Sequence, residues 1–266
     1  MTITNAAVLF NHKLSEDSCL IGLKAPQVAE KAQPGQFVML RMQDELWRHR
    51  LSRPFSLCRV ENDIVEIYFR IVGSGTRMLS GCSQGDTMEL LGPLGNGFTI
   101  SPRSELNIMV AGGMGVAPFP FLALRLSQLC QKAKNVLFTG AKTKDHLHHL
   151  DYFEEIGVQI RLATDDGSAG YKGFVTELFE QELDEIVRGR SEVKIFACGP
   201  QPLLKKTAEI AIEHDIACQV AMEERMACGT GACLACVCKT GESNRWKYSR
   251  VCKEGPIFDA KEIIFD

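Results

Sequence analysis

The sequence lacks any apolar run long enough to cross a membrane. A spanning helix needs about 20 consecutive apolar residues, and no stretch of the 266 residues approaches that length. The N-terminus lacks the basic and apolar segments of a secretory signal. Positive charge is not in excess either, since the formal net charge is −3. These absences favour a cytoplasmic protein that has no membrane anchor and no nucleic-acid partner.

Cysteine, by contrast, is abundant, with 11 residues in the chain. A chain of this length without a secretory segment is not a disulfide scaffold. The composition is otherwise globular, with 45% hydrophobic and 24% charged residues. The length suits two compact domains and a small module.

Four cysteines near the C-terminal end have the spacing of an iron–sulfur ligand set. Cys228, Cys233 and Cys236 form a C-x4-C-x2-C run, and Cys252 follows after a further loop. This is the plant-ferredoxin arrangement for a [2Fe–2S] cluster, which requires soft thiolate ligands. Glycines between the first two cysteines permit backbone conformations that let the loop wrap closely around a cluster.

Two other interpretations of these cysteines stay open. One is a zinc site, although zinc ribbons usually pair two short C-x2–4-C knuckles. The other is a set of buried structural cysteines, which would not need this spacing. Cys238 lies two residues after Cys236 and is interpreted as a spectator on the opposite side of a strand.

The first part of the chain is predicted to form a small antiparallel barrel. Residues 63–70 alternate polar and apolar side chains, as a half-buried strand does, and Pro34-Gly35 marks a turn. Short, evenly spaced strands without helical periodicity are typical of such barrels.

Two segments of this barrel suggest a phosphate site. Arg53 lies in an Arg-Pro-Phe-Ser segment, where a guanidinium at a strand edge can hold a pyrophosphate by two hydrogen bonds. Further on, Gly73 and Gly75 precede Thr76, which is expected to cap a helix whose N-terminus favours an anion. Each segment alone is equally consistent with an ordinary strand followed by a turn.

From Leu106 onward, strands alternate with helices, which implies a parallel sheet. Buried strands are predicted at residues 107–111, 135–140, 158–164 and 193–198. Glycine turns follow the first strand, at Gly112–Gly115, and the last, at Cys198-Gly199-Pro200. Ligands of such sheets bind at the carboxyl edge, where glycine lets the backbone approach a phosphate. Cys198 is also consistent with a small core residue.

A polar stretch after the second of these strands carries histidines and lysines. His146, His148 and His149 lack metal-ligand spacing, so we expect them to be solvated. Lys142 and Lys144 could meet a 2′-phosphate or could be solvated. NAD and NADP therefore both stay open.

In their order, these motifs resemble the ferredoxin–NADP reductase superfamily. Its flavin-binding barrel carries an Arg-x-(Tyr/Phe)-(Ser/Thr) motif and a later Gly-Thr phosphate loop, and its Gly-Gly loop and Cys-Gly-Pro turn flank the nicotinamide nucleotide. The resemblance implies FAD binding by Arg53, Pro54, Phe55, Ser56, Arg70, Ile71, Val72, Gly75 and Thr76. It implies NAD binding by Gly112, Gly113, Gly115, Cys198, Gly199 and Pro200.

The C-terminal third narrows the resemblance to the electron-transfer subunits of B-type dihydroorotate dehydrogenases. Met222–Cys233 and Arg250–Phe258 match that family, as do Thr164–Ser168 and Lys172–Thr176. The match covers essentially the whole chain. Phe55 departs from it, because many relatives carry a smaller apolar residue there.

This resemblance implies an electron relay in pyrimidine (UMP) biosynthesis. Dihydroorotate is oxidised on a separate FMN-containing catalytic subunit, and electrons pass through the [2Fe–2S] cluster and FAD of this chain to NAD+. No room is left for a dihydroorotate-oxidising barrel of about 250 residues, so the partner is expected to be another polypeptide that docks at the cluster loop. The family implies a heterotetramer with two copies of each subunit.

The predicted fold class is multi-domain β plus α/β. We expect a flavin-binding antiparallel β-barrel at residues 1–101, a parallel-sheet NAD-binding domain at 102–222 and a small [2Fe–2S] module at 223–266, with Cys228, Cys233, Cys236 and Cys252 as ligands. Two alternative functions stay open. One is an NAD(P)H reductase serving an oxygenase, glutamate synthase or hydrogenase partner, and the other is a non-enzymatic redox sensor, which would need no nicotinamide site.

Overall fold

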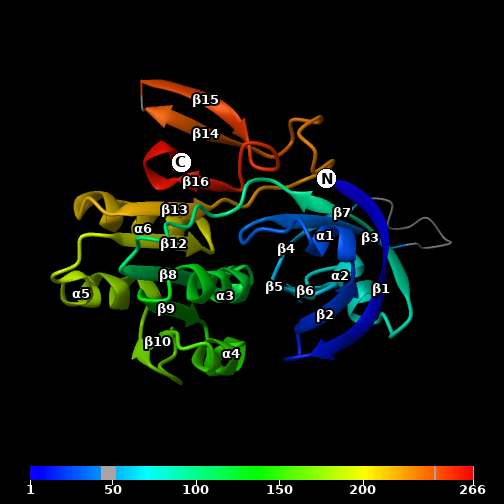
Figure 1. Cartoon of the computed structure of the whole chain (residues 1–266), viewed down its shortest axis with the longest axis horizontal. Helices are drawn as coiled ribbons and strands as arrows, with labels where there is room; N and C mark the ends of the chain where they lie inside the picture. Colours follow the sequence, from blue (N-terminus) through cyan, green and yellow to red (C-terminus); the bar gives the residue numbers. More distant parts are fainter. Residues whose placement is uncertain (43–51, 243, 266) are drawn as a thin grey trace.

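The structure is a computed structural model and describes residues 1–42, 52–242 and 244–265. Two seven-stranded sheets lie beside each other, and a two-stranded hairpin stands against them near the C-terminus (Figure 1). Among the described residues, no helix has both the length and the apolar character needed to cross a membrane.

The N-terminal sheet is antiparallel, with strand order β4-β3-β7-β1-β2-β6-β5. Its elements are β1 (Thr2–Lys13), β2 (Ser18–Lys24), α1 (Pro26–Ala29), β3 (Phe37–Met42), β4 (Arg53–Ser56), β5 (Arg59–Glu61), β6 (Ile64–Arg70), α2 (Ser74–Ser80) and β7 (Thr87–Leu94). The two edges meet where β4 runs into β5. There the Leu57 amide donates to the Gln36 carbonyl, and the Cys58 amide donates to the Glu66 carbonyl. The sheet thus curls back on itself, and the predicted antiparallel barrel is confirmed.

Strand β6 shows why sequence alternation alone misjudges burial. Val65, Ile67 and Phe69 point into the barrel core, as the alternating pattern predicts. Glu66 and Tyr68 on the other face are also buried, at 7% and 5% exposure, because Arg59 pairs with Glu66 and side chains of the second domain pack on Tyr68. The strand is therefore buried on both faces, not half-buried as expected.

The second sheet has the order β11-β10-β9-β8-β12-β13-β16 and is parallel from β11 to β13. Its elements are β8 (Leu106–Gly112), η1 (Gly113–Val116), α3 (Phe119–Leu129), β9 (Lys134–Ala141), η2 (Lys144–His146), α4 (Leu150–Glu155), β10 (Gln159–Thr164), β11 (Tyr171–Lys172), α5 (Val175–Val187), β12 (Val193–Cys198), α6 (Gln201–Glu213) and β13 (Ala217–Ala221). Helices α3 and α4 pack on one face, and α5 and α6 pack on the other. The predicted parallel sheet is confirmed, and its strand order reverses between β8 and β12.

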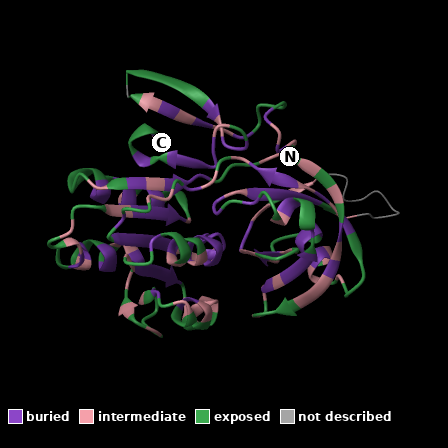
Figure 2. Ribbon diagram, viewed as in Figure 1, coloured by how far each residue is buried: buried purple, intermediate pink, exposed green. Residues whose placement is uncertain are grey.

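The C-terminal segment belongs to two structures. Strands β14 (Val237–Glu242) and β15 (Arg245–Arg250) form the hairpin, whereas β16 (Ile257–Asp259), followed by η3 (Ala260–Glu262), pairs antiparallel with β13. Buried residues from the hairpin base and from both sheets are continuous, as Figure 2 shows in purple. The cysteine loop is thereby fixed to both sheets.

The histidines of the polar stretch join the two sheets, so the prediction that all of them are solvated was wrong. The rings of His148 and His149 meet Tyr68 edge-on, with centroids 5.7 and 4.7 Å away. His148 Nε2 lies 3.2 Å from Ser18 Oγ. Arg59 of the barrel also contacts the second domain, since its guanidinium carbon lies 4.7 Å from the ring centroid of Tyr152. The error arose because a contact from another domain leaves no mark in the local sequence.

Candidate functional site

A cavity of about 370 Å³ lies between the barrel and the carboxyl edge of the parallel sheet. Pockets of a few hundred cubic ångströms are typical of small-molecule and cofactor sites. The cavity is lined by Gly35, Phe37, Pro54, Phe55, Ser56, Pro118, Cys198, Ala221, Met222, Glu223, Glu224, Arg225, Met226 and Pro256. It therefore brings residues of the predicted flavin motif face to face with the predicted nicotinamide turn, although more than 140 positions separate them in the sequence.

The two predicted phosphate segments also meet. A Cβ placed on Gly75 would lie only 2.1 Å from Cζ of Arg53, so the guanidinium sits directly against this glycine. Strand β4 holds Arg53 opposite Leu40 of β3. The guanidinium therefore lies beside the first turn of α2, and an arginine there can bind an anion through two hydrogen bonds.

Thr76 takes part in capping helix α2, as predicted, from a position inside the helix. Helix α2 begins at Ser74, so Thr76 lies within its first turn. Its hydroxyl accepts hydrogen bonds from the amides of Val72 and Gly73, at 2.9 and 3.2 Å. Thr76 therefore fixes the entry of the chain into the helix.

The structure keeps Arg70, Ile71 and Val72 apart from the cavity wall, since none of them is among the described residues that line it. Arg70 Nε lies 3.1 Å from a carboxylate oxygen of Asp17, and the Ile71 amide donates to the Asp17 carbonyl. Val72 is 78% exposed. Their assignment to FAD stays a prediction and concerns the part of the ligand outside the cavity.

The glycine turn and the Cys198 turn pack against each other at the point where the strand order reverses. A Cβ on Gly115 would lie 2.1 Å from the Cys198 carbonyl oxygen, and one on Gly199 would lie 3.1 Å from the Gly112 amide nitrogen. Gly113 has a φ of 54°, in the left-handed region. Such a reversal point at the carboxyl ends of parallel strands is where doubly wound sheets bind nucleotides.

Cys198 lines the cavity as a neutral thiol. Burial, reinforced by the carboxylate of Glu223, raises its pKa far above the ordinary range. Burial also raises the pKa of Glu223 itself. Sequence reasoning missed residues 222–226 as cavity wall. Their place directly after the last parallel strand, at the ligand-binding edge, is the signal that could have revealed them.

The four predicted ligands come together as two thiol pairs. Burial raises the pKa of the Cys228 thiol, but hydrogen bonds from Thr230 and Cys233 outweigh this and lower the pKa to about 5. In the other pair, burial and a hydrogen bond with Cys236 raise the pKa of Cys252 to about 12. The Cys252 amide also donates to Cys236 Sγ over 3.4 Å.

This pairing fits a binuclear cluster better than a zinc ion. Zinc gathers its ligands around one point, whereas the four thiols here form one pair within the loop and a second pair that joins the loop to Cys252. A [2Fe–2S] cluster takes four thiolates shared between two irons. Cys238 lies within β14, after the cysteine loop, is 8% exposed and lies opposite Ser249 across the hairpin.

A thin wall of barrel residues separates the cysteine loop from the cavity. A Cβ on Gly229 would lie 2.6 Å from Cγ of Met39, so the loop packs directly on β3. Phe37, on the same strand, lines the cavity and shares a buried cluster with Met39, Cys236 and Cys252. The two candidate redox sites are therefore linked through buried side chains of β3.

Comparison with known proteins agrees with this geometry. Residues 223–264 match the iron-sulfur cluster binding domain of dihydroorotate dehydrogenase B, and residues 109–209 match the oxidoreductase NAD-binding domain. The chain is 35% identical, over 98% of both chains, to the dihydroorotate dehydrogenase B (NAD(+)) electron transfer subunit of Caldanaerobacter subterraneus subsp. tengcongensis.

Solved structures give the same result for the fold. A structure of the NADH-dependent reduced ferredoxin-NADP oxidoreductase superimposes with a TM-score of 0.83 at 29% identity, covering 98% of this chain and 90% of that one. A ferredoxin NADP+ reductase from Neisseria gonorrhoeae shares the fold at 17% identity, with a TM-score of 0.67 over 80% and 92% of the two chains. The site geometry agrees with a similarity to the curated relative that extends over nearly the full length of both chains. The chain therefore belongs to the family of dihydroorotate dehydrogenase B electron transfer subunits.

Proposed function

We propose that the chain passes electrons from the FMN of a dihydroorotate-oxidising catalytic subunit, through its own [2Fe–2S] cluster and FAD, to NAD+ in pyrimidine biosynthesis. The observation that carries the proposal is the wall of Phe37 and Met39, which has the cavity on one side and the cysteine loop on the other. A redox sensor would need no cavity of this kind beside its cluster. An electron relay requires both the cavity and the cysteine loop, and it requires that they lie in contact.

Each group of residues has a separate task in this proposal. Arg53 would hold the FAD pyrophosphate against Gly75, and Pro54, Phe55 and Ser56 would line the ring site. A bound flavin supplies the exchange between a two-electron hydride and single electrons. The neutral thiol of Cys198 would close the nicotinamide side without placing a charge against it.

The nucleotide and the cluster have their own residue sets. Gly112, Gly113, Gly115, Gly199 and Pro200 would let the backbone approach the nucleotide phosphates at the sheet edge. Cys228 with Cys233 and Cys236 with Cys252 would each supply two thiolates to the cluster. The domain boundaries at residues 101 and 222 belong to the proposal, with β16 adding an edge strand to the parallel sheet from the C-terminal side.

The partner is part of the same proposal. The curated relatives are electron transfer subunits, a name that implies a catalytic subunit. We infer that this subunit carries FMN, that the assembly holds two copies of each chain and that the complex works in the cytoplasm. Mass measurement of the purified complex tests the stoichiometry, and cell fractionation tests the location.

The decisive experiment removes the cluster but keeps the rest of the chain. A folded, flavin-loaded Cys236→Ser variant should still let NADH bleach the flavin absorbance. Assembled with the catalytic subunit, it should fail to couple dihydroorotate oxidation to NAD reduction, while the catalytic subunit still reduces an artificial dye. NAD reduction at the parent rate would show that electrons bypass the cluster, and the relay would be wrong.

The wild-type chain distinguishes this proposal from a reductase that serves another acceptor. Mixed with the catalytic subunit from the same organism, it should reduce NAD+ when dihydroorotate is supplied. If it exchanges hydride with NADH but takes no electrons from a catalytic subunit supplied with dihydroorotate, the acceptor is a different protein.

A further inference from the structure

The hairpin of β14 and β15 has one covered face and one open face. Cys238, Thr240 and Ser249 are buried on the inner face, where the Thr240 and Ser249 hydroxyls lie 2.6 Å apart. The outer side chains are Val237, Lys239, Trp246, Tyr248 and Arg250, which we call the hairpin face. A two-stranded hairpin thus presents a complete sheet face to solvent.

The hairpin face carries aromatic side chains in an ordered arrangement. Trp246 is 45% exposed and Tyr248 is 61% exposed. Their rings meet edge-on with centroids 5.1 Å apart, and the Lys239 ammonium lies 5.4 Å from the Trp246 ring centroid. Rigid aromatic anchors of this kind are enriched in the centres of protein–protein interfaces.

Leu234 connects the hairpin face to the candidate cluster. It lies in the cysteine loop between Cys233 and Cys236, is 63% exposed and has a φ of 59°. Leucine rarely adopts the left-handed region, and such strain tends to be retained where it serves function. The backbone here stores strain to hold an apolar side chain outward, beside an exposed ligand.

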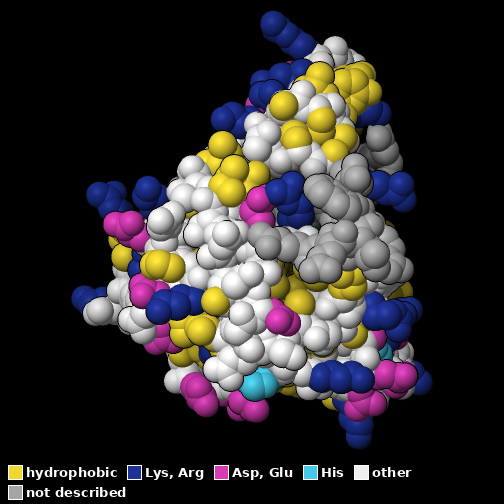
Figure 3. All heavy atoms as spheres, turned by 90° about the vertical axis from the view of Figure 1, so that its right-hand side faces the viewer, with side chains coloured by type: hydrophobic (Ala, Val, Ile, Leu, Met, Phe, Trp, Pro, Cys, Tyr) yellow, Lys and Arg dark blue, Asp and Glu magenta, His cyan; other side chains and the backbone are white. Residues whose placement is uncertain are grey.

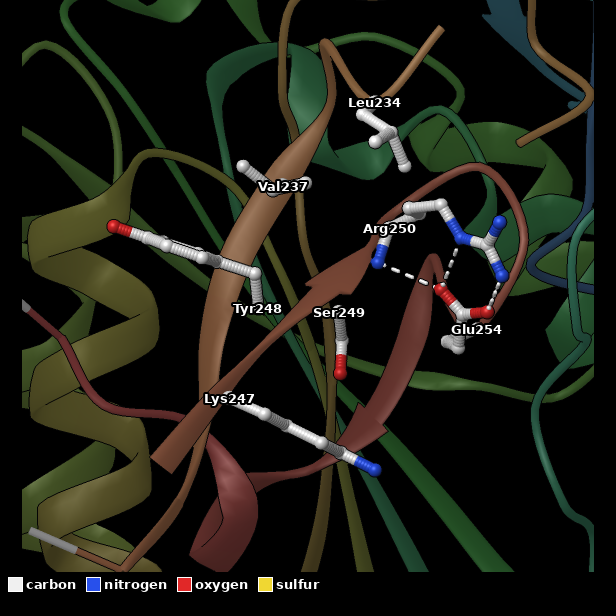
Figure 4. A pocket seen from close by; sticks show the side chains of 7 residues that line it. All are labelled: Leu234, Val237, Lys247, Tyr248, Ser249, Arg250 and Glu254. Carbon is white, nitrogen blue, oxygen red and sulfur yellow. Dashed lines mark hydrogen bonds and ion pairs between the residues drawn. The ribbon is translucent and has the colours of Figure 1, made fainter. Parts of the chain in front are cut away.

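Leu234 and the hairpin border a groove of about 520 Å³, which is lined by Leu234, Val237, Lys247, Tyr248, Ser249, Arg250 and Glu254. Figure 4 shows Leu234 at one end of this groove, the Arg250–Glu254 ion pair beside it, and Tyr248 and Lys247 extending to opposite sides of β15. The groove is therefore continuous with the cysteine loop.

The charge around the groove is opposite in sign to that of the whole chain. Residues 237–254 contain five lysines or arginines and two glutamates, although the chain has a net charge of −3. In Figure 3, hydrophobic side chains at the upper end of the molecule lie among lysine and arginine side chains. An apolar centre with a cationic rim fits an apolar side chain ringed by carboxylates.

We infer that the hairpin face and Leu234 form the surface on which the dihydroorotate-oxidising subunit docks, through an apolar anchor with acidic neighbours. The inference rests on the proposed function and extends it from the cluster loop to a defined groove. A protein seated there covers the only exposed cysteine of the predicted ligand set among the described residues, Cys233. It thereby brings its own redox centre to the outer side of the cluster.

Binding to the purified catalytic subunit tests the inference with the full-length, cofactor-loaded chain. Trp246→Ser and Tyr248→Ser should each raise Kd tenfold or more, whereas Phe174→Ser, which alters an aromatic side chain that is 65% exposed on the parallel-sheet domain, should leave it unchanged. Lys239→Glu, which reverses a charge on the hairpin face, should slow association and weaken its dependence on salt. The cluster absorbance of each variant shows that the cysteine loop is intact.

A measurement on the unmodified chain covers the case in which a hairpin variant misfolds. Amide hydrogen exchange of residues 245–250 should slow when the catalytic subunit binds. No slowing, or unchanged Kd in the hairpin variants, would overturn the inference while the wild-type chain still couples dihydroorotate to NAD+. Slowing in the chain alone as its concentration rises would instead assign the face to a second copy. Failure of the wild-type chain to couple would be a failure of the proposed function.

Discussion

The cysteine loop and the cavity are adjacent but are built in different ways. Three of the four predicted ligands lie within nine residues, so the local sequence brings them together. The cavity takes its walls from the barrel, the parallel sheet and the segment after β13. The loop is thus a local site that needs all four of its ligands. The cavity, by contrast, lies between two domains, and its shape depends on how the two sheets pack against each other.

This difference predicts how each region fails. Removing one thiolate leaves an iron without a ligand, which the rest of the loop cannot replace. Altering one wall of the cavity removes only part of the binding energy of the ligand, because the other walls still contact it. The variants below separate the two modes.

The largest effect is expected from Cys252→Ser, which breaks the buried thiol pair with Cys236. The reduced-cluster EPR signal should disappear, because a hydroxyl is a poor ligand for iron in this setting. Cys238→Ser is the matched control, since Cys238 is a buried cysteine of β14 outside the predicted ligand set. If the control also loses the signal, the ligand set has been misassigned.

Gly115→Ala should damage the cavity edge more than any single side-chain removal. The new Cβ would lie 2.1 Å from the Cys198 carbonyl oxygen, a backbone atom that cannot step aside without moving the turn. Overpacking of this kind costs about 1–3 kcal/mol, and NADH should bleach the flavin far more slowly in stopped-flow measurements. Gly81→Ala, whose Cβ would meet its nearest atom at 3.4 Å, should behave like the parent. A normal bleaching rate in Gly115→Ala would remove the two turns from the nucleotide site.

Arg53→Ala should weaken FAD binding without destroying the fold. Loss of a charge-assisted hydrogen bond costs about 1.5–3 kcal/mol, so the purified variant should retain less flavin and bind added FAD more weakly in fluorescence titrations. Arg77→Ala, an exposed arginine on α2, controls for a general change in charge. Full FAD occupancy and unchanged FAD affinity in Arg53→Ala would show that Arg53 does not bind the pyrophosphate.

The smallest effect is expected at the contact of His148 and His149 with Tyr68, which joins the parallel-sheet domain to the barrel. Burial, with the charges of His148 and Arg59, lowers the pKa of His149 to about 4. Because the folded-state pKa lies below the unfolded value of about 6.5, stability is complete above pH 6.5 and is lost as pH falls toward 4. The free energy of unfolding should drop by roughly 1 kcal/mol between pH 7 and 5.5 on this account.

His149→Asn tests this linkage, because asparagine tolerates the left-handed backbone at this position, where φ is 66°. Denaturant unfolding at the two pH values should show a smaller loss in the variant than in the parent. Exposed His12 changed to asparagine should keep the parent's pH dependence. If the free energy of unfolding falls equally with pH in the parent and in His149→Asn, His149 does not titrate as described.

Prediction from the sequence was most successful where the information is local. The strands at 107–111, 135–140 and 193–198 are present with small shifts at their ends. Thr76 was expected to cap a helix, and its hydroxyl does accept hydrogen bonds from the Val72 and Gly73 amides at the start of α2. The prediction for the histidines failed, since their partners come from another domain.

The sequence by itself determined the chemistry of this protein. Ligand spacing, the Arg-Pro-Phe-Ser segment and the glycine turns are local patterns, because thiolates, guanidinium groups and close backbone approach act over a few residues. Only the tertiary structure decided that these parts meet. It placed Arg53 against Gly75 and Gly115 against Cys198, and it set Met39 behind Gly229 as part of the wall between cavity and loop. The reason is that such contacts depend on the closure of the barrel and on the packing of one sheet against another, and both are set by the whole core.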